Sequence, residues 1–347
     1  MRVRRPAPAP IPTPVFDDGR CSLSRFTDSR CAICAEICPT DALTAEADGL
    51  ALNRDACTGC GACAGACPAQ AIRLPGLLPL PPAAPDRTGA VTLICSRHPH
   101  AGRSAGPLCL RALGLEALAR LWLDGVRVIR LATGDCAECA SGPATGFEDR
   151  LARLNGLLAD RGLAPMRSQP ATAADLGRGP WLGDAEDRPD PARRSLLRRL
   201  SLDVSVAETQ PAQSALARLQ KTGQGDADAR IAYQPHLSAS DCTGCNACTR
   251  ICPHAVLTLV NVGRPGAAYA VSGETCTGCG VCVDVCDSGA VVIVRDAPGV
   301  PDLPLVAYRC RACGVESHAP ERQETVPELC GVCIRTRHSA KLFQVLE

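Results

Sequence analysis

Apolar residues form their longest patterns in the middle of the chain. An apolar run over 91–95 predicts a strand, and apolar positions at helical spacing over 108–124 predict a helix. A second strand is predicted over 126–131, and a second helix over 147–160. This alternation of strand and helix is typical of a small α/β layer, which we expect over 86–168.

Towards both ends the apolar runs are short, and each one follows a group of cysteines. These runs are 42–43, 71–72, 255–257 and 290–293. Runs of this length predict small strands rather than one large core. Residues 75–85 and 165–190 are rich in proline or glycine and predict linkers. A helix predicted over 192–200 carries four arginines, and its simplest interpretation is a solvated face.

Composition narrows the class of protein. The chain has 347 residues, a net charge of +1 and only 3% aromatic residues. No strong attraction to nucleic acid follows from that charge. The basic start of the chain has no apolar segment typical of a secretory signal, and no apolar stretch is long enough to span a membrane. We therefore expect a cytoplasmic protein whose 24 cysteines are metal-bound thiolates.

The cysteines repeat one motif, Cys-x2-Cys-x2-Cys-x3-Cys. The three full copies begin at Cys57, Cys242 and Cys276. A fourth copy over 31–38 has the last three cysteines, and Cys21 can supply the first. The copies fall in two pairs, at 21–72 and 242–293.

Four cysteines at this spacing predict a [4Fe–4S] cluster. The first three form a tight loop around one face of a cluster, and the fourth ligates the other cluster of the pair. Zinc sites instead use two separated Cys-x2-Cys pairs. The predicted ligand sets are Cys57, Cys60 and Cys63 with Cys38; Cys21, Cys31 and Cys34 with Cys67; Cys242, Cys245 and Cys248 with Cys286; and Cys276, Cys279 and Cys282 with Cys252.

Two departures from the motif change its interpretation. Nine residues separate Cys21 from Cys31, where two are usual. The alternative is a free Cys21 with an absent or three-iron cluster. Asp287 replaces the usual proline after Cys286, which alters the turn but not the ligand.

Residues 21–72 and 242–293 resemble the two-cluster ferredoxin modules of bacteria. The resemblance implies a compact α+β fold for each module and paired clusters close enough for fast electron transfer. We therefore expect an α+β protein of two such modules, an α/β insert and a zinc-ribbon-like end. The expected segments are a first module over 1–80, the insert over 86–168, a linker with the arginine-rich helix over 169–228, a second module over 229–297 and the terminal segment over 298–347.

The last four cysteines have the spacing of a zinc ribbon. They form two Cys-x2-Cys pairs separated by sixteen residues: Cys310, Cys313, Cys330 and Cys333. Four thiolates suit zinc or a single iron. Structural Zn²⁺ is the first choice, because the segment is too short to build its own core. A rubredoxin-like iron, a bare site and a cluster are the alternatives.

Four further cysteines lie in the insert: Cys95, Cys109, Cys136 and Cys139. Cys95 ends a predicted strand and Cys136 follows the next one, so both are expected at the same edge of the sheet, where ligand sites gather. A further metal or cluster site is one interpretation, and buried cysteine with a reactive dithiol is the other. The arrangement resembles the cysteine-bearing domain of hydrogenase delta subunits. The nearby His98 and His100 are interpreted as loop residues.

The whole chain is similar to polyferredoxin-like iron–sulfur proteins associated with formate dehydrogenases and other molybdoenzymes. The resulting hypothesis is a non-catalytic subunit that passes single electrons through four [4Fe–4S] clusters to or from a redox partner. We expect this subunit neither to bind nucleic acid nor to insert into a membrane. A second hypothesis is a reductase component with a catalytic thiol or cluster site in the 95–139 region. A third is a maturation factor for a molybdoenzyme.

Overall fold

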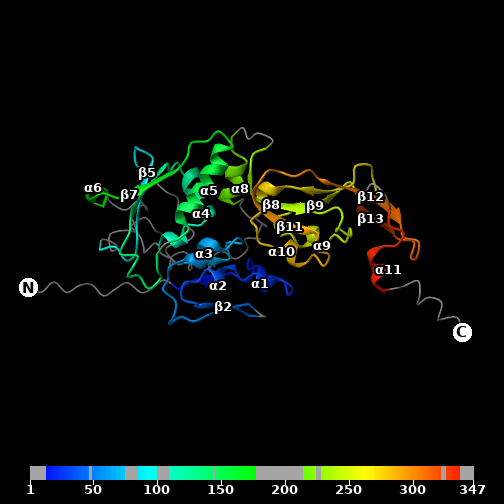
Figure 1. Ribbon diagram of the computed structural model, residues 1–347, viewed down its shortest axis with the longest axis horizontal. Helices are drawn as coiled ribbons and strands as arrows, with labels where there is room; N and C mark the ends of the chain where they lie inside the picture. Colours follow the sequence, from blue (N-terminus) through cyan, green and yellow to red (C-terminus); the bar gives the residue numbers. More distant parts are fainter. Residues whose placement is uncertain are drawn as a thin grey trace, which may run out of the picture. The chain divides into compact units, whose positions relative to one another are not determined.

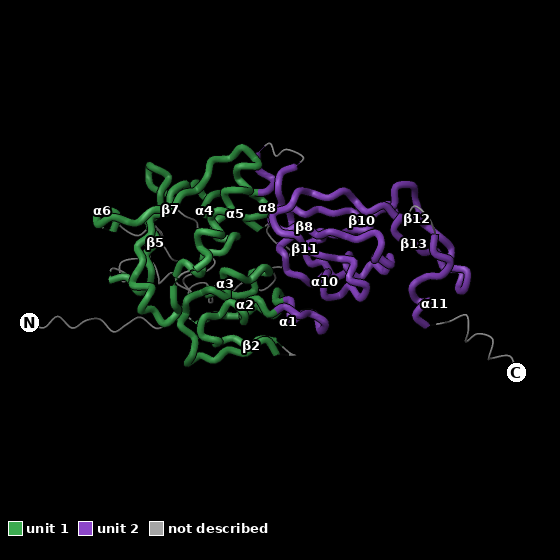
Figure 2. The backbone as a smooth tube through the Cα atoms, viewed as in Figure 1, with its two compact units in different colours: residues 1–21, 32–219 green, residues 22–31, 220–347 purple. Residues whose placement is uncertain are grey.

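A computed structural model of the chain mixes short helices and strands (Figure 1). It describes residues 13–46, 49–74, 85–99, 109–143, 145–176, 214–223, 228–321 and 326–336. The chain divides into two compact units (Figure 2). Unit 1 comprises residues 1–21 and 32–219, and unit 2 comprises residues 22–31 and 220–347. None of the described helices combines the length and apolar character that a membrane crossing requires.

The first part of unit 1 is built from two-residue to five-residue elements around cysteines. Its elements are β1 (Val15–Phe16), α2 (Ile33–Glu36), β2 (Leu43–Glu46), β3 (Gly49–Leu52), α3 (Ala62–Ala66) and β4 (Ile72–Arg73). Strand β1 pairs antiparallel with β4, and β2 pairs antiparallel with β3. Its buried cluster consists of Cys34, Leu43, Cys63 and Ile72. Cysteines therefore form half of a core that has few other side chains to fill it.

The rest of unit 1 contains a parallel three-stranded sheet in the order β5-β6-β7. Its elements are β5 (Ala90–Ile94), the 3₁₀ turn η2 (Leu110–Ala112), α4 (Leu115–Leu123), β6 (Val128–Ala132), α5 (Phe147–Ala159), β7 (Arg167–Pro170) and α6 (Ala173–Leu176). Helix α4 buries leucines and Trp122, whose Nε1 donates to the carbonyl of Ala164 over 2.8 Å. Helices α4 and α5 pack together. The strand-helix alternation expected over this part of the chain is present.

Two predictions of secondary structure differ in detail from the observed structure, and a third concerns residues that the structure does not describe. The helix predicted over 108–124 begins only at Leu115, because Gly114 is extended and separates it from the 3₁₀ turn. Gly114 also lies so close to Gly65 that an added Cβ would clash with the Gly65 carbonyl oxygen. The predicted linker contains β7 and α6, since polar β7 needs only its pairing with β6 to form a strand. The arginine-rich helix over 192–200 lies outside the described residues.

Unit 2 has two antiparallel sheets. Its elements are α1 (Ser22–Arg25), β8 (Ile231–Leu237), α9 (Ala247–Ile251), β9 (Leu257–Val260), β10 (Ala268–Val271), the 3₁₀ turn η4 (Gly273–Thr275), α10 (Val281–Asp284), β11 (Val291–Ala297), β12 (Leu303–Arg309), β13 (Glu316–Pro320) and α11 (Gly331–Thr336). Helix α8 (Ala215–Gln220) belongs to unit 1 except for its last residue. Strand β8 pairs with β11, and the second sheet has the order β13-β12-β10-β9. The β12–β13 hairpin thus continues a sheet of the second cysteine module.

Candidate metal centres

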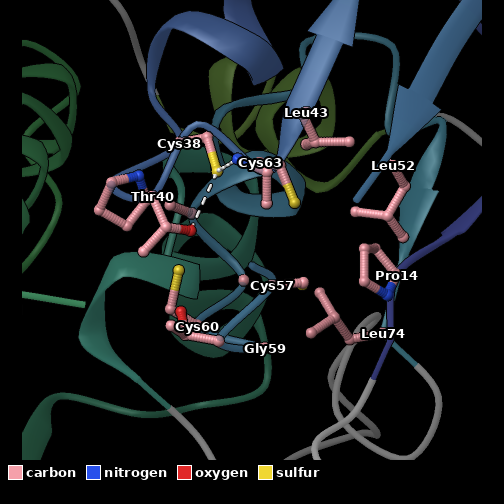
Figure 3. Close-up of a pocket in the computed structure, with 15 residues that line it drawn as sticks. Pro14, Cys38, Thr40, Leu43, Leu52, Cys57, Gly59, Cys60, Cys63 and Leu74 are labelled. Atoms are coloured by element: carbon pink, nitrogen blue, oxygen red, sulfur yellow. Dashed lines mark hydrogen bonds between the residues drawn. The ribbon is translucent and has the colours of Figure 1, made fainter. Parts of the chain in front are cut away.

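Four cysteines from two motifs line one small cavity in unit 1. Cys57, Cys60 and Cys63 come from one motif, and Cys38 is the fourth cysteine of the preceding motif. Figure 3 shows these four side chains with Leu43, Leu52 and Leu74 among the residues that line the cavity. The cavity is partly open to solvent and has a volume of about 350 Å³. Its walls are apolar, so water is poorly placed to compete for anything that the thiolates bind.

Unit 2 repeats this arrangement twice. Cavities of about 330 and 310 Å³ are each lined by four cysteines. The first set is Cys252, Cys276, Cys279 and Cys282, and the second is Cys242, Cys245, Cys248 and Cys286. In both, the fourth cysteine comes from the other motif of the pair. Three cavities of nearly equal size, each with four thiols, are the same kind of site.

The loop between the first three cysteines of each full motif depends on two left-handed residues. Gly59 and Gly61 have φ values of 64° and 76°, and Gly278 and Gly280 have 75° and 80°. Glycine adopts this conformation without a steric penalty. At the corresponding place in the middle motif stands Asn246, with φ of 63°. The repeated Thr-Gly after the first cysteine is therefore a backbone requirement for wrapping three sulfurs around one cavity.

A second turn positions the fourth cysteine of every motif. The third residue after it has a positive φ in all four copies: Asp41, Gln70, Ala255 and Gly289. The next N–H then donates to the cysteine sulfur. The four bonds are Ala42 to Cys38 (3.3 Å), Ala71 to Cys67 (3.3 Å), Val256 to Cys252 (3.3 Å) and Ala290 to Cys286 (3.2 Å). Such N–H donors stabilise charge on cluster sulfurs and tune the reduction potential.

Burial makes these thiols reluctant to ionise on their own. The pKa of Cys63, Cys248 and Cys276 is raised to about 12 in each case, mainly by removal from water and in smaller part by neighbouring cysteine charges. Four thiolates in such a cavity need a cationic partner, and metal binding displaces their protons. The donor set therefore fits a metal cluster.

The two sites of each module meet at their third-position cysteines. Cys34 and Cys63 share the core of the first module with Leu43 and Ile72. Cys248 and Cys282 share the equivalent core with Leu257 and Val291. In each pair the charge of the first cysteine raises the pKa of the second. One cysteine of each paired site therefore belongs to the same small apolar core.

The stretched motif is only partly described within one unit. Cys21 is buried, and its charge contributes to raising the pKa of Cys67, after burial as the main cause. Cys34 lies in the same unit. Cys31 belongs to unit 2, so its role as the fourth ligand remains a sequence prediction.

The terminal cysteines form a tighter site. The sulfurs of Cys310, Cys313, Cys330 and Cys333 all lie within 4.8 Å of one another, and those of Cys313 and Cys330 are 3.8 Å apart. A tetrahedral site with metal–sulfur bonds of about 2.3 Å separates its sulfurs by about 3.8 Å. Backbone N–H groups, including that of Cys330 at 3.2 Å, lower the pKa of Cys310 to about 6. This geometry fits one metal ion.

The insert cysteines are more widely spread. Among the described residues, the terminal quartet alone brings four cysteine ligand atoms within that limit. Cys95, Cys109, Cys136 and Cys139 are free of disulfides and partly buried. His98 follows Cys95 in a tight turn, its N–H bonded to the Cys95 carbonyl, and His100 lies outside the described residues.

Sequence analysis missed a polar cluster beside the second module. Asn246 Oδ1 lies 2.6 Å from the Tyr269 hydroxyl and 2.8 Å from His318 Nε2. Burial, and then the nearby cysteine charges, raise the pKa of Tyr269, so its hydroxyl stays protonated and donates. Burial lowers the pKa of His318. The sequence did contain a sign of this cluster, since Asn246 occupies a position where the other full motifs have glycine.

Comparison with known families identifies two matches. Residues 241–290 match the 4Fe–4S dicluster domain, and residues 50–73 match the 4Fe–4S binding domain. No curated protein matches the chain. Two ferredoxin-type domains are thus present, and they indicate iron–sulfur binding and a role in electron transfer.

Proposed function

We propose that this protein is an electron-transfer subunit that holds four [4Fe–4S] clusters in its two ferredoxin-type modules. The observation that carries the proposal is the set of three cavities of similar size, each lined by four cysteines contributed by both motifs of a pair. The fourth cluster is assigned to Cys21, Cys31, Cys34 and Cys67. When bound, such a cluster supplies the gain and loss of one electron without bond chemistry.

The protein's own residues provide everything else that the proposal needs. Apolar walls exclude water, and the N–H groups that follow each fourth cysteine offset thiolate charge. The shared core between Cys248 and Cys282 keeps the paired sites adjacent. These features favour rapid exchange of single electrons over a reaction on a bound substrate.

The terminal quartet is proposed to hold structural Zn²⁺. A closed site of four thiolates is typical of structural zinc. It would join the end of β12 to the start of α11, two segments that share few buried side chains apart from the cysteines. A rubredoxin-like iron would fit the same sulfur separation, and metal analysis distinguishes the two.

The proposed partner is a redox protein of the cytoplasm, with a formate dehydrogenase or another molybdoenzyme as the first candidate. This rests on the resemblance of the whole chain to proteins associated with such enzymes. Affinity purification of the full chain from its native cells tests it. A molybdoenzyme recovered in fixed ratio supports a subunit, and recovery of immature enzyme alone would indicate a maturation factor instead.

The first experiment is metal and sulfide analysis on protein purified without oxygen. Four cubanes require about 16 iron and 16 acid-labile sulfide ions per chain. Structural zinc adds about one Zn. A content of about 12 iron would mean that the stretched motif holds no complete cluster. Substitution Cys279→Ser should remove about four iron ions, and an unchanged iron content would refute the assignment of that cavity.

A further inference from the structure

The insert cysteines lie at the carboxyl edge of the parallel sheet, and local contacts bring their loops together. Strands β5 and β6 run parallel, with Ile94 paired to Ala132. Cys95 follows β5 directly, and its N–H donates to the Ala132 carbonyl over 2.8 Å. Cys136 and Cys139 come a few residues after β6. Both strands therefore deliver cysteines to the same end of the sheet.

Close packing joins the Cys95 turn to the loop that carries Cys136 and Cys139. A Cβ added at Gly134 would stand 2.7 Å from the Arg97 carbonyl oxygen, so only glycine fits between the two segments. The N–H of Arg97 lies 3.5 Å from the Cys95 sulfur. A backbone N–H two residues after a cysteine can donate to its sulfur and so stabilise the thiolate form. Turns that present a cysteine to a metal commonly have this arrangement.

Cys109 joins the group from a third segment. Its pKa is raised to about 11, mainly by burial and in smaller part by the charges of Cys95 and Cys60. These contributions require both cysteines to be near. The Arg111 N–H donates to the Cys109 sulfur, which repeats the bond found at Cys95.

The same segment is attached to the loop after β6. Arg111 Nη2 donates a hydrogen bond of 2.7 Å to the Pro143 carbonyl. The Gly142 N–H donates a hydrogen bond of 2.7 Å to the Cys139 carbonyl. Arg111 Nε is buried and has no hydrogen-bond partner among the described residues. A guanidinium placed here offsets the negative charge of several thiolates. Three separate segments, each carrying one or two of the cysteines, thus contact one another beside one cation.

The group also borders the first ferredoxin module. Ser141 Oγ donates to Thr58 Oγ1 over 2.8 Å, and Thr58 lies between Cys57 and Cys60. Cys60 belongs to the same loop, and its charge contributes to raising the pKa of Cys109. The insert quartet therefore lies against one specific loop of the cavity shown in Figure 3.

The insert quartet lacks the tight geometry of a single-ion site. Among the described residues, the terminal tetrathiolate brings its four sulfurs within 4.8 Å of one another, whereas the insert quartet and the ferredoxin quartets do not. An iron–sulfur cluster is larger than one metal ion, so its ligand sulfurs stand farther apart. The wider spacing of the insert quartet is therefore compatible with a cluster.

We infer that Cys95, Cys109, Cys136 and Cys139 bind a fifth iron–sulfur cluster, which extends the electron route from the first ferredoxin module into the insert. The inference rests on the proposed function. Binding releases the protons of the four thiols. Each electron gained at this site is one lost at the neighbouring site, so no further oxidant or reductant is needed.

The test counts iron and unpaired spins in the full chain, purified without oxygen and reduced with dithionite. Four cubanes correspond to about 16 iron ions and about four spins, since each reduced cluster carries one. A fifth cluster raises these counts to about 18 or 20 iron ions, for a two-iron or four-iron cluster, and about five spins. A content of 16 iron with four spins that Cys136→Ser with Cys139→Ser leaves unchanged, with or without a second zinc, would overturn the inference and leave the proposed function intact.

Paired variants assign the additional cluster. Cys136→Ser with Cys139→Ser should remove about two or four iron ions and one spin, with the other signals unchanged. Asp135→Asn is the matched control, because Asp135 Oδ1 accepts the N–H of Ala137 at 3.0 Å and an amide oxygen can do the same. Wild-type counts in the double variant would refute the inference. Wild-type counts in Cys279→Ser would refute the proposed function instead.

Discussion

The side-chain oxygen of Asn246 accepts a hydrogen bond of 2.6 Å from the hydroxyl of Tyr269. Asn246 belongs to the cysteine loop of the second module, and Tyr269 is buried in β10. The bond therefore joins a ligand loop to the sheet that continues into the terminal metal site. It also gives a reason for a non-glycine residue with φ of 63° at this position.

Substitution of Asn246 should separate the two roles of this residue. Asn246→Ala loses the acceptor and keeps the unfavourable φ, whereas Asn246→Gly loses the acceptor alone. We expect both variants to be less stable, by about 0.5–1.5 kcal/mol, because the Tyr269 hydroxyl loses its 2.6 Å bond to Asn246 and keeps only the 3.3 Å contact with His318 Nε2. Alanine should cost about 1 kcal/mol more than glycine. Thermal loss of cluster absorbance measures this, and equal stability of all three proteins would contradict the assignment.

The exchange of fourth cysteines predicts which cluster each substitution removes. Cys252→Ser should abolish the same paramagnetic signal as Cys276→Ser, because both residues line one cavity. It should spare the signal that Cys242→Ser abolishes, although Cys242 is in the same motif as Cys252. Spectra of the three reduced variants decide the matter. Loss of one common signal in Cys252→Ser and Cys242→Ser would show that each motif holds its own cluster.

Cys21 is expected to complete the stretched motif. Its side chain is only 7% exposed, and its charge acts on Cys67. Cys21→Ser should therefore lower the iron content by about four ions per chain. Cys60→Ser should remove as many, but from the other cluster of the module, with a different spectral loss. An iron content unaffected by Cys21→Ser would leave Cys21 as a free thiol.

Asp86 should stabilise the insert only above acidic pH. The Arg130 guanidinium, 2.7 Å away, and then Thr88 hold the pKa of Asp86 well below its usual range. The carboxylate's contribution is thus complete above the unfolded pKa of about 3.9 and is lost as the pH falls below it.

Asp86→Asn tests this dependence. Hydrogen exchange of β5 and β6 should be a few-fold faster in the variant at pH 7, since partly exposed ion pairs contribute only about 0.2–1 kcal/mol. The difference should shrink as the pH falls below about 4. Asp124→Asn is the control, because Asp124 pairs with Arg120 at 3.8 Å at the end of α4. A difference that grew at low pH would contradict the prediction.

Cysteine spacing by itself determined the local part of the candidate sites. Three cysteines within seven residues, with a glycine after the threonine, form one loop whatever surrounds them, because the left-handed turns are local. The short strands after each motif and the two strands and helices of the insert were also predictable, since they depend on periodicity within one segment. The third strand, β7, was not predicted, because its polar sequence becomes a strand only by pairing with β6.

Tertiary structure decided which distant groups meet. Asn246, Tyr269 and His318 are separated by tens of residues, as are Thr58 and Ser141, and no periodic pattern encodes such pairs. The continuation of one sheet into the terminal metal segment is equally non-local. The geometry of each loop is determined by residues that are neighbours in sequence. Contacts between loops depend instead on how the short helices and strands pack around the cavities that the cysteines line.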